Sequence, residues 1–442
     1  MSSGLTRRRV TFVDVMRVRE FRVLWFADSQ SAVGDQLARV ALSALVFQRT
    51  SSAVLTGLTY SLTFFPALLS GALLSSLADR LPRRRVLIGC DVIRAVLFGA
   101  MALPNVPFWL LAALLVLAIL AESPFIAAES ALIPLILPDE DLYLVGTGIR
   151  TITNQIAQLI GFAGGGLAIA ILGARAGLAL DGATFALSGV LIWIGVQARP
   201  AAQTKDPQDE VVTRSSSALS AGLRLVFHDP RLRTLLGLSW LAGLYVVPEG
   251  VAAPYTHALH HGSSALGFLM AANPTGVALG TYLFVRWVPS RLRSSLMAPL
   301  GMTAGLPLLL CLPLPPLPIS ILLWGASGFF FCYQVQVVTE FMRSVPDDQR
   351  GQAAGIASSG LLVVQGVGVL LGGVVAELWG VRWAVSGAGV LGMLLALSLG
   401  VMWSRANLQD SRASAVAVGP RHRKPAARPN TRSRSTSRSQ LP

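Results

Sequence analysis

Long apolar runs, separated by short polar breaks, occupy most of the chain between residues 21 and 403. A helix needs ~20 consecutive apolar residues to cross a bilayer, and longer runs indicate helices that tilt or extend beyond the hydrocarbon. The pattern predicts an all-α polytopic membrane protein with twelve membrane-spanning helices. They cover 21–48, 52–77, 85–104, 106–136, 142–172, 176–197, 232–257, 263–286, 294–313, 317–342, 351–378 and 382–403.

A polar stretch at 198–231 is the one long break in this pattern, and it divides the predicted helices six and six. We therefore predict a cytoplasmic N-terminal segment, a first six-helix half, a cytoplasmic linker, a second six-helix half and a basic tail. The boundaries of these regions are 1–20, 21–197, 198–231, 232–404 and 405–442.

The two predicted halves share residues at a constant spacing of 207 positions. A glutamine and an arginine recur in register with the glycines, so glycine abundance alone does not explain the matches. The pairs are Gln158 and Gln365, Gly161 and Gly368, Gly165 and Gly372, Gly166 and Gly373, Gly173 and Gly380, Arg175 and Arg382, and Pro82 and Pro289. Two parallel six-helix units with the solute site between them are a common design of secondary transporters.

Composition excludes an ordinary soluble domain. Hydrophobic residues make up 53% of the chain and charged residues 13%, whereas a soluble domain carries about a quarter charged residues. The net charge of +14 does not indicate nucleic-acid binding, because from Arg405 onward nine Lys or Arg face a single acid, Asp410. This tail is rich in Arg, Ser and Pro, which predicts disorder. It is either a solvated extension or a contact for lipid headgroups.

Basic residues gather on one side of the predicted bundle. They occupy the N-terminal segment, the loop at 80–85, the central linker and the tail, whereas the opposite loops hold only Arg49, Arg175 and Arg382. The positive-inside rule therefore predicts that both termini are cytoplasmic. Arginine greatly outnumbers lysine, and we expect a multi-pass protein of a bacterial inner (plasma) membrane.

Metal, cofactor and enzyme chemistry are not expected. Cys90, Cys311 and Cys332 lie within apolar runs without metal-ligand or disulfide spacing, and the histidines at 257–261 adjoin no cysteine or acid. The sequence contains no HExxH motif and no Walker loop.

The loop between the second and third predicted spans reads Gly71-Ala-Leu-Leu-Ser-Ser-Leu-Ala-Asp79-Arg80-Leu-Pro-Arg83-Arg84-Arg85. It resembles the signature loop of the major facilitator superfamily, in which Asp-Arg and a basic cluster latch the two halves in the outward-facing state. Ser75 and Pro82 stand where the family usually has glycines, so we expect a looser helix approach with the charges kept. The resemblance implies a gating role for Asp79, Arg80, Arg83, Arg84, Arg85, Asp91 and Arg94.

Three further segments, Gly34-Asp35, Pro248-Glu249 and 346–351, are similar to a branch that includes enterobactin exporters and macrolide efflux proteins. The resemblance runs from Phe21 to about Trp403. It implies alternating-access, proton-coupled export of a small amphipathic drug, siderophore or secondary metabolite by a monomer. A nutrient importer or facilitator is the alternative, disfavoured because the midplane is mostly Leu, Ala, Gly and Val. A non-transporting sensor is a third class, for which no motif is present.

Span 5 carries a cluster of glycines where antiporters of the superfamily usually have Gly-Pro-x-x-Gly-Gly. Glycines let helices approach closely, and the missing proline removes a kink. We predict helix packing for Gly161, Gly164, Gly165, Gly166, Gly372 and Gly373, and a role specific to export is the alternative.

Ionisable residues inside predicted spans are costly and mark functional sites. Asp35 lies near the middle of the first span, and Arg39 follows one turn later, close enough to pair with it. Glu122 and Glu129 lie in span 4, and Glu249 lies in span 7 beside a proline. Burial favours the neutral form of a carboxyl and a nearby cation favours the charged form, so these acids are candidates for proton coupling or substrate binding.

Span 5 also carries a polar stripe of Arg150, Asn154 and Gln158 at one-turn intervals. We expect it to line a cavity or to pair with one of the glutamates. Asp28 is expected at the membrane interface. The alternative for every acid is a structural ion pair with an arginine.

Overall fold

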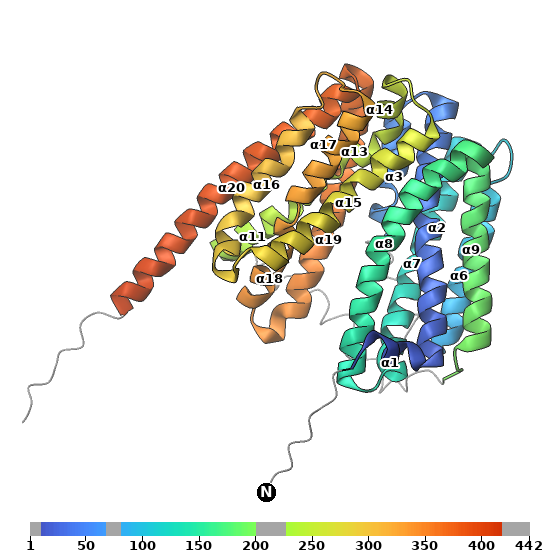
Figure 1. Ribbon diagram of the computed structural model, residues 1–442, viewed down its shortest axis with the longest axis horizontal. Helices are drawn as coiled ribbons and strands as arrows, with labels where there is room; N and C mark the ends of the chain where they lie inside the picture. Colours follow the sequence, from blue (N-terminus) through green and yellow to red (C-terminus); the bar gives the residue numbers. More distant parts are fainter. Residues whose placement is uncertain (1–9, 68–80, 200–226, 418–442) are drawn as a thin grey trace, which may run out of the picture.

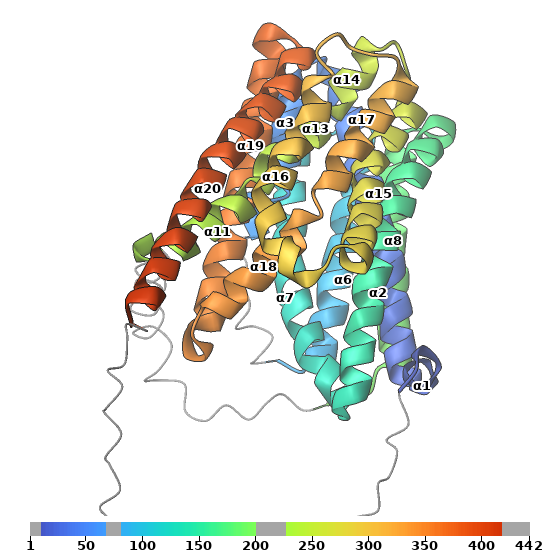
Figure 2. The same cartoon turned by 60° about the vertical axis from the view of Figure 1, so that its left-hand side comes forward.

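The computed structural model describes residues 10–67, 81–199 and 227–417, and all regular secondary structure in these ranges is helical. In lipid the backbone polar groups have no water to bind, and a helix satisfies them within its own segment. The helices form two groups that stand side by side (Figures 1 and 2).

The first helical group spans residues 12–195. Its members are α1 (Phe12–Arg17), α2 (Arg19–Thr50), α3 (Ala53–Ser61), α6 (Arg83–Met101), α7 (Phe108–Ile136), α8 (Glu140–Leu172) and α9 (Ala174–Gly195). Within it α2 packs against α8 and α9, and α6 packs against α7 and α9.

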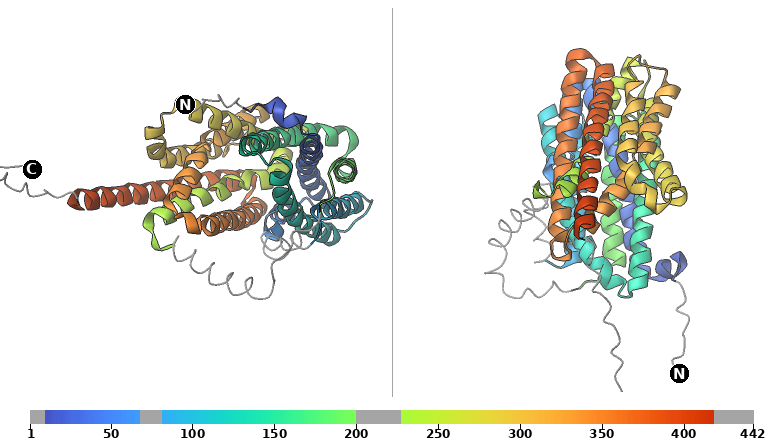
Figure 3. Two further views of the ribbon diagram at one scale, coloured as in Figure 1. Left: turned by 90° about the horizontal axis from the view of Figure 1, so that it is seen from below. Right: turned by 90° about the vertical axis from the view of Figure 1, so that its left-hand side faces the viewer.

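The second helical group spans residues 230–417. Its members are α11 (Pro230–Trp240), α12 (Ala242–Tyr245), α13 (Val247–Gly250), α14 (Ala252–Ala258), α15 (Ser263–Trp287), α16 (Ser290–Leu309), α17 (Leu317–Phe330), α18 (Tyr333–Ser344), η1 (Asp347–Gln349), α19 (Arg350–Trp379) and α20 (Val381–Ala417). Here α16 packs against α17 and α20, and α15 packs against α17. Figure 3 shows the two groups from below, with the end of α20 running out beyond the bundle.

Seven helices of the described ranges are long and apolar enough to cross a membrane, and an eighth is obtained if Pro230–Gly250 and Ala252–Ala258, bent by 45°, form one span. Every one of the twelve predicted ranges overlaps a helix or a series of short helices. The first predicted range corresponds to α2, which is not one of these seven helices. Asp28, Asp35 and Arg39 in its interior make it less apolar than those seven. The described part of the chain is thus all-helical, with several helices suited to crossing a membrane.

Three boundaries differ from the sequence prediction. Residues 12–17 form α1, within the N-terminal segment for which no helix was predicted. Span 7 is divided into α11 to α14, and Pro248 and Pro254, which lack the N–H groups that a continuous helix needs, lie close to the breaks at 246 and 251. The last helix passes the predicted end at 404 and continues to Ala417, through a stretch of helix-forming Arg, Ala, Leu and Gln. The rest of the predicted tail lies outside the described residues.

The most extensive contacts between the two groups are two helix crossings, α8 against α15 and α3 against α19. A Cβ atom on Gly166 would lie 2.5 Å from the Cα of Gly267, and one on Gly57 would lie 3.1 Å from the Cα of Gly373. Glycine permits such close backbone approach. Both crossings lie toward the end of the molecule that carries α14, away from α1 (Figure 1).

The other glycines that were predicted to pack differ in how closely a neighbouring helix approaches them. A Cβ on Gly161 would lie 2.6 Å from the Cβ of Gln36, one on Gly165 would lie 2.9 Å from the Cα of Leu37, and one on Gly372 would collide with Val247. Gly164 has nothing within 4 Å of its Cβ position, so the packing prediction is wrong for this residue. Gly164 is exposed, whereas Gly161, Gly165 and Gly166 are buried against neighbouring helices.

Candidate functional site

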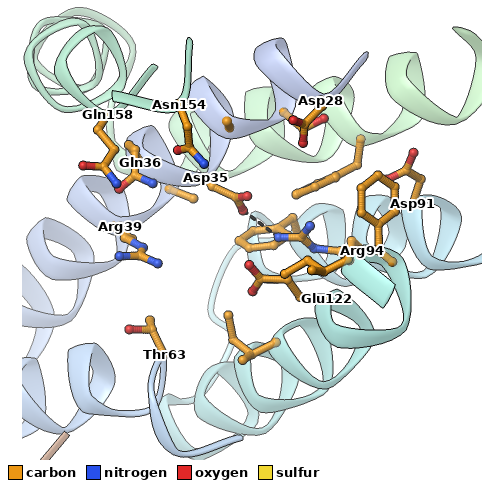
Figure 4. A pocket seen from close by; sticks show the side chains of 18 of the residues that line it. Asp28, Asp35, Gln36, Arg39, Thr63, Asp91, Arg94, Glu122, Asn154 and Gln158 are labelled. Carbon is orange, nitrogen blue, oxygen red and sulfur yellow. Dashed lines mark hydrogen bonds and ion pairs between the residues drawn. The ribbon is translucent and has the colours of Figure 1, made fainter. Parts of the chain in front are cut away.

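A cavity of about 400 Å³ lies inside the first helical group. Helices α2, α6, α7, α8 and α9 line it, and charged side chains converge on it from several of them (Figure 4). Phe98, Ile119, Phe125 and Phe185 supply apolar lining between the charges. The cavity therefore offers both polar and apolar contacts.

Asp35 of α2 forms an ion pair with Arg94 of α6, with 2.7 Å between Oδ1 and Nη2. Arg94 is 4% exposed, and its guanidinium carbon lies 3.9 Å from the centroid of the Phe185 ring. The sequence predicted Arg39 as the partner of Asp35, and the structure corrects this. Arg39 instead lies on the other side of Asp35, toward Thr63 (Figure 4). A neighbour on another helix reaches the carboxylate better than the residue one turn along the same helix.

Arg150 of α8 joins two acids at the α1 end of the cavity. Its guanidinium lies 3.4 Å from Asp28 Oδ2 and also forms an ion pair with Glu129 of α7. Asp28 therefore lines the cavity, where the sequence had suggested the membrane interface. Arg150, Asn154 and Gln158 all line the cavity from α8, so the structure places this stripe both along the cavity and against a glutamate.

Three more acids complete the cluster. Glu122 of α7 lines the cavity near Arg94, Asp35 and Arg39. Asp91 and Asp181 are buried behind Arg94, at 1% and 0% exposed. Within the described residues the cluster thus holds twice as many carboxyl groups as guanidinium groups. The carboxyls are those of Asp28, Asp35, Asp91, Glu122, Glu129 and Asp181, and the guanidiniums are those of Arg39, Arg94 and Arg150.

A hydrogen bond links this cluster to the second helical group. The Tyr60 hydroxyl of α3 donates to Glu249 Oε2 of α13 at 2.6 Å, and Arg39 lies close enough to act on both electrostatically. Sequence reasoning singled out Glu249 but missed Tyr60, because nothing in an apolar span shows which tyrosine faces the opposite group. The contact places Glu249 between the two groups.

Replacing Tyr60 with phenylalanine is expected to lower the free energy of unfolding by about 1–3 kcal/mol, because the half-buried Glu249 carboxylate loses its hydrogen-bond donor. Equilibrium unfolding in mixed micelles measures the change. Tyr282→Phe is the matched control, since that ring is 66% exposed on α15. Equal stabilities of the two variants would contradict a structural contribution of the hydroxyl.

The predicted gating loop is only partly described. Asp79 and Arg80 lie outside the described residues. Arg83, Arg84 and Arg85 begin α6, and the Arg84 guanidinium donates to the carbonyl oxygen of Trp193 on α9. Arg94 and Asp91, predicted as further members of the gate, line the cavity, and the Asp91 carboxylate lies near Ser188. A gating role for the loop stays a prediction.

Metal-ligand geometry is not found in the described ranges, where no three His, Cys, Asp or Glu side chains come together as a metal site. Cys90, Cys311 and Cys332 are buried free thiols.

The sequence profile of the Major Facilitator Superfamily matches residues 24–340 and, in a second alignment, 249–436. The chain is 26% identical over 388 residues to the multidrug efflux pump Tap of Mycolicibacterium fortuitum, covering 85% of this chain and 92% of that protein. It is 28% identical over 374 residues to Tap of Mycobacterium tuberculosis H37Rv, covering 79% and 85%. Macrolide efflux protein A of Streptococcus pyogenes is 24% identical over 127 residues, which is 28% of this chain and 31% of that protein.

Solved structures share the fold. A bacterial homologue of the human lysosomal transporter Spinster, in an inward-facing and unoccupied conformation, superposes with a TM-score of 0.70 at 15% identity, covering 91% of this chain and 99% of that one. A POT family transporter in complex with a thioalcohol-conjugated peptide gives 0.69 at 14% identity, covering 88% and 96%.

Proposed function

This chain belongs to the Major Facilitator Superfamily and is a membrane transporter of a small molecule rather than an enzyme, and from that premise we propose that it exports an amphipathic solute in exchange for protons. The relatives named Tap are multidrug efflux pumps, which favours a drug, a siderophore or another secondary metabolite as the solute. The mixture of charged and aromatic lining in the cavity suits a molecule of this kind.

The imbalance of charge in the cavity is the observation that carries the proposal. Six carboxyl groups share three guanidinium groups, and several of the acids are almost fully buried. An uncompensated buried charge is expensive, so the cluster favours binding protons at some of these acids. A solute or a rearrangement that changes which acid an arginine contacts would release or take up a proton. Proton binding and solute binding are then linked at one site.

In an alternating-access cycle the site would open in turn to the cytoplasm and to the outside, so that solute and protons cross in opposite directions. We propose that the twelve helical segments form two six-helix repeats that rock about the site. α1 and the C-terminal end of α20 lie at one end of the molecule (Figure 2), and the arginine-rich segments mark that end as cytoplasmic. The glycine crossings lie toward the opposite, outer end. The protein would therefore reside in the bacterial inner membrane with both termini in the cytoplasm.

Transport into inverted vesicles with an imposed pH gradient tests the proposal. A panel of antibiotics, siderophores and sugars is offered to the wild type and to Asp35→Asn and Glu122→Gln, which remove one titrating carboxyl each. We expect accumulation of an amphipathic compound by the wild type and at least about a tenfold loss in each variant, as for loss of a positioned proton-transfer group.

Glu140→Gln is the matched control, because Glu140 lies exposed in the first turn of α8, outside the cavity. It should transport as the wild type does. Accumulation of a sugar alone, unaffected by Asp35→Asn or Glu122→Gln, would overturn the exporter proposal and favour a nutrient importer or facilitator.

A further inference from the structure

A groove of about 640 Å³ lies between α16 and α20, on the outside of the second helical group. Arg291 and Arg405 line one end of it, and Pro299, Met302 and Leu397 line the apolar remainder. The two helices cross closely at its floor, where a Cβ on Gly400 would lie 2.8 Å from the Cβ of Ala298. The groove thus combines two cations at one end with an apolar channel.

The first helical group contains a groove at the corresponding place, between α6 and α9. It has a volume of about 420 Å³ and is lined by Arg84, Trp193 and Arg199. Arg84 and Arg291 are separated by 207 residues, the spacing at which the two halves of the sequence match.

The two grooves differ in what their arginines bind. In the first, the Arg84 guanidinium donates to the Trp193 carbonyl, which is free because α9 ends at Gly195 and leaves its last carbonyls without partners. Arg199 forms a two-pronged ion pair with Glu20, in which Nη2 lies 2.8 Å from Oε2. Arg84 and Arg199 therefore each have an acceptor within the protein.

The second groove lacks both acceptors. α20 continues to Ala417, so the carbonyls near Trp403 remain engaged in the helix, and no carboxylate lines the groove. Among the side chains that the structure describes, which in this half are those of residues 227–347 and 349–405, none forms an ion pair or a side-chain hydrogen bond with Arg291 or Arg405. The hydroxyls of Ser295 and Ser404 donate to carbonyls of their own helices, and that of Ser294 donates to Glu340, so the arginines are the donors available to a ligand.

We propose that this groove binds an anionic phospholipid of the cytoplasmic leaflet, with the phosphate between Arg291 and Arg405 and an acyl chain along Pro299, Met302 and Leu397. The lipid supplies the acceptor that the protein itself supplies in the first groove. Guanidinium groups bind phosphate strongly, and basic pockets between transmembrane helices suit acidic lipid headgroups. The leaflet follows from the orientation proposed above, whereas the binding itself does not require that transport occurs.

Lipid binding to the full-length protein in detergent tests this inference. Phosphatidylglycerol is titrated into the protein and bound lipid is counted by native mass spectrometry, with phosphatidylcholine and inorganic phosphate as comparison ligands. We expect phosphatidylglycerol to bind more tightly than phosphatidylcholine. Removing both guanidiniums in Arg291→Gln/Arg405→Gln should weaken its apparent affinity about thirtyfold, from the contribution of a basic side chain near an acidic lipid surface.

Two variants serve as controls and should bind as the wild type does: Arg84→Gln at the repeat-related position and Arg286→Gln at the end of α15. Equal affinities for the two lipids, or an unchanged double variant, would overturn the proposal. So would displacement by inorganic phosphate at equal concentration, which indicates a free-anion site. A photoactivatable phosphatidylglycerol on the wild type adds a readout independent of folding, and crosslinks confined to surfaces other than α16 and α20 would also refute the site.

Discussion

Replacing Arg94 with glutamine is expected to abolish transport and to lower the free energy of unfolding by about 3–5 kcal/mol, the usual cost of removing one partner of a buried ion pair. The guanidinium is 4% exposed, lies 2.7 Å from Asp35 and stacks on Phe185. Without it, six carboxyls would share two guanidiniums. Equilibrium unfolding in mixed micelles and uptake into inverted vesicles measure the two effects.

A second substitution separates the two roles of Arg94. Asp35→Asn in the Arg94→Gln background removes the uncompensated charge, so it should restore most of the lost stability while transport stays absent. Arg94→Lys keeps a charge but loses the planar, stacked geometry, and we expect an intermediate stability. A stable Arg94→Gln protein that still transports would refute the assignment of Arg94 to the site.

Gly166→Ala is expected to slow transport by about fivefold to about a hundredfold while leaving the protein folded. The added methyl group would lie 2.5 Å from the backbone of Gly267 only when the two helical groups are closed against each other. Overpacking of this kind costs about 1–3 kcal/mol, and each 1.4 kcal/mol shifts an equilibrium about tenfold. The closed arrangement at the outer end would become rare, and the cycle would stall.

Gly164→Ala is the matched control for this change, because it adds the same methyl group two residues away, where nothing lies within 4 Å. It should transport at the wild-type rate. Similar rates for both variants would show that the crossing of α8 and α15 does not limit the cycle. An unfolded Gly166→Ala protein would show instead that this crossing contributes to folding.

The helices were predictable from the sequence because a membrane span is a property of one continuous segment. Hydropathy over ~20 residues located α7, α8 and α19 without any knowledge of their neighbours. The division of span 7 was harder to predict, although the sequence has Pro248 and Pro254 within it. A proline removes one hydrogen bond, and the neighbouring helices decide whether the helix kinks or breaks.

The sequence identified many of the residues that form the site, but not which of them contact each other. The stripe of Arg150, Asn154 and Gln158 was recognisable because all three lie on one face of one helix. The partner of Asp35 was not, because helical spacing identifies neighbours on the same helix only. Arg94 reaches Asp35 from α6. The importance of Tyr60 likewise depends on the approach of the two helical groups, which no periodicity in the sequence encodes.

The glycine crossings have a thermodynamic consequence for the transport cycle. Side chains that interlock across an interface lose rotamer entropy each time the interface forms, by up to about 2 kcal/mol for long residues, whereas glycine loses none. Where Gly166 meets Gly267 and Gly57 meets Gly373, backbone contacts backbone. The outer end can then close and open with little loss of side-chain entropy. Neither arrangement is strongly favoured in free energy by this interface. The balance between the two arrangements is left to the small free energies of solute and proton binding.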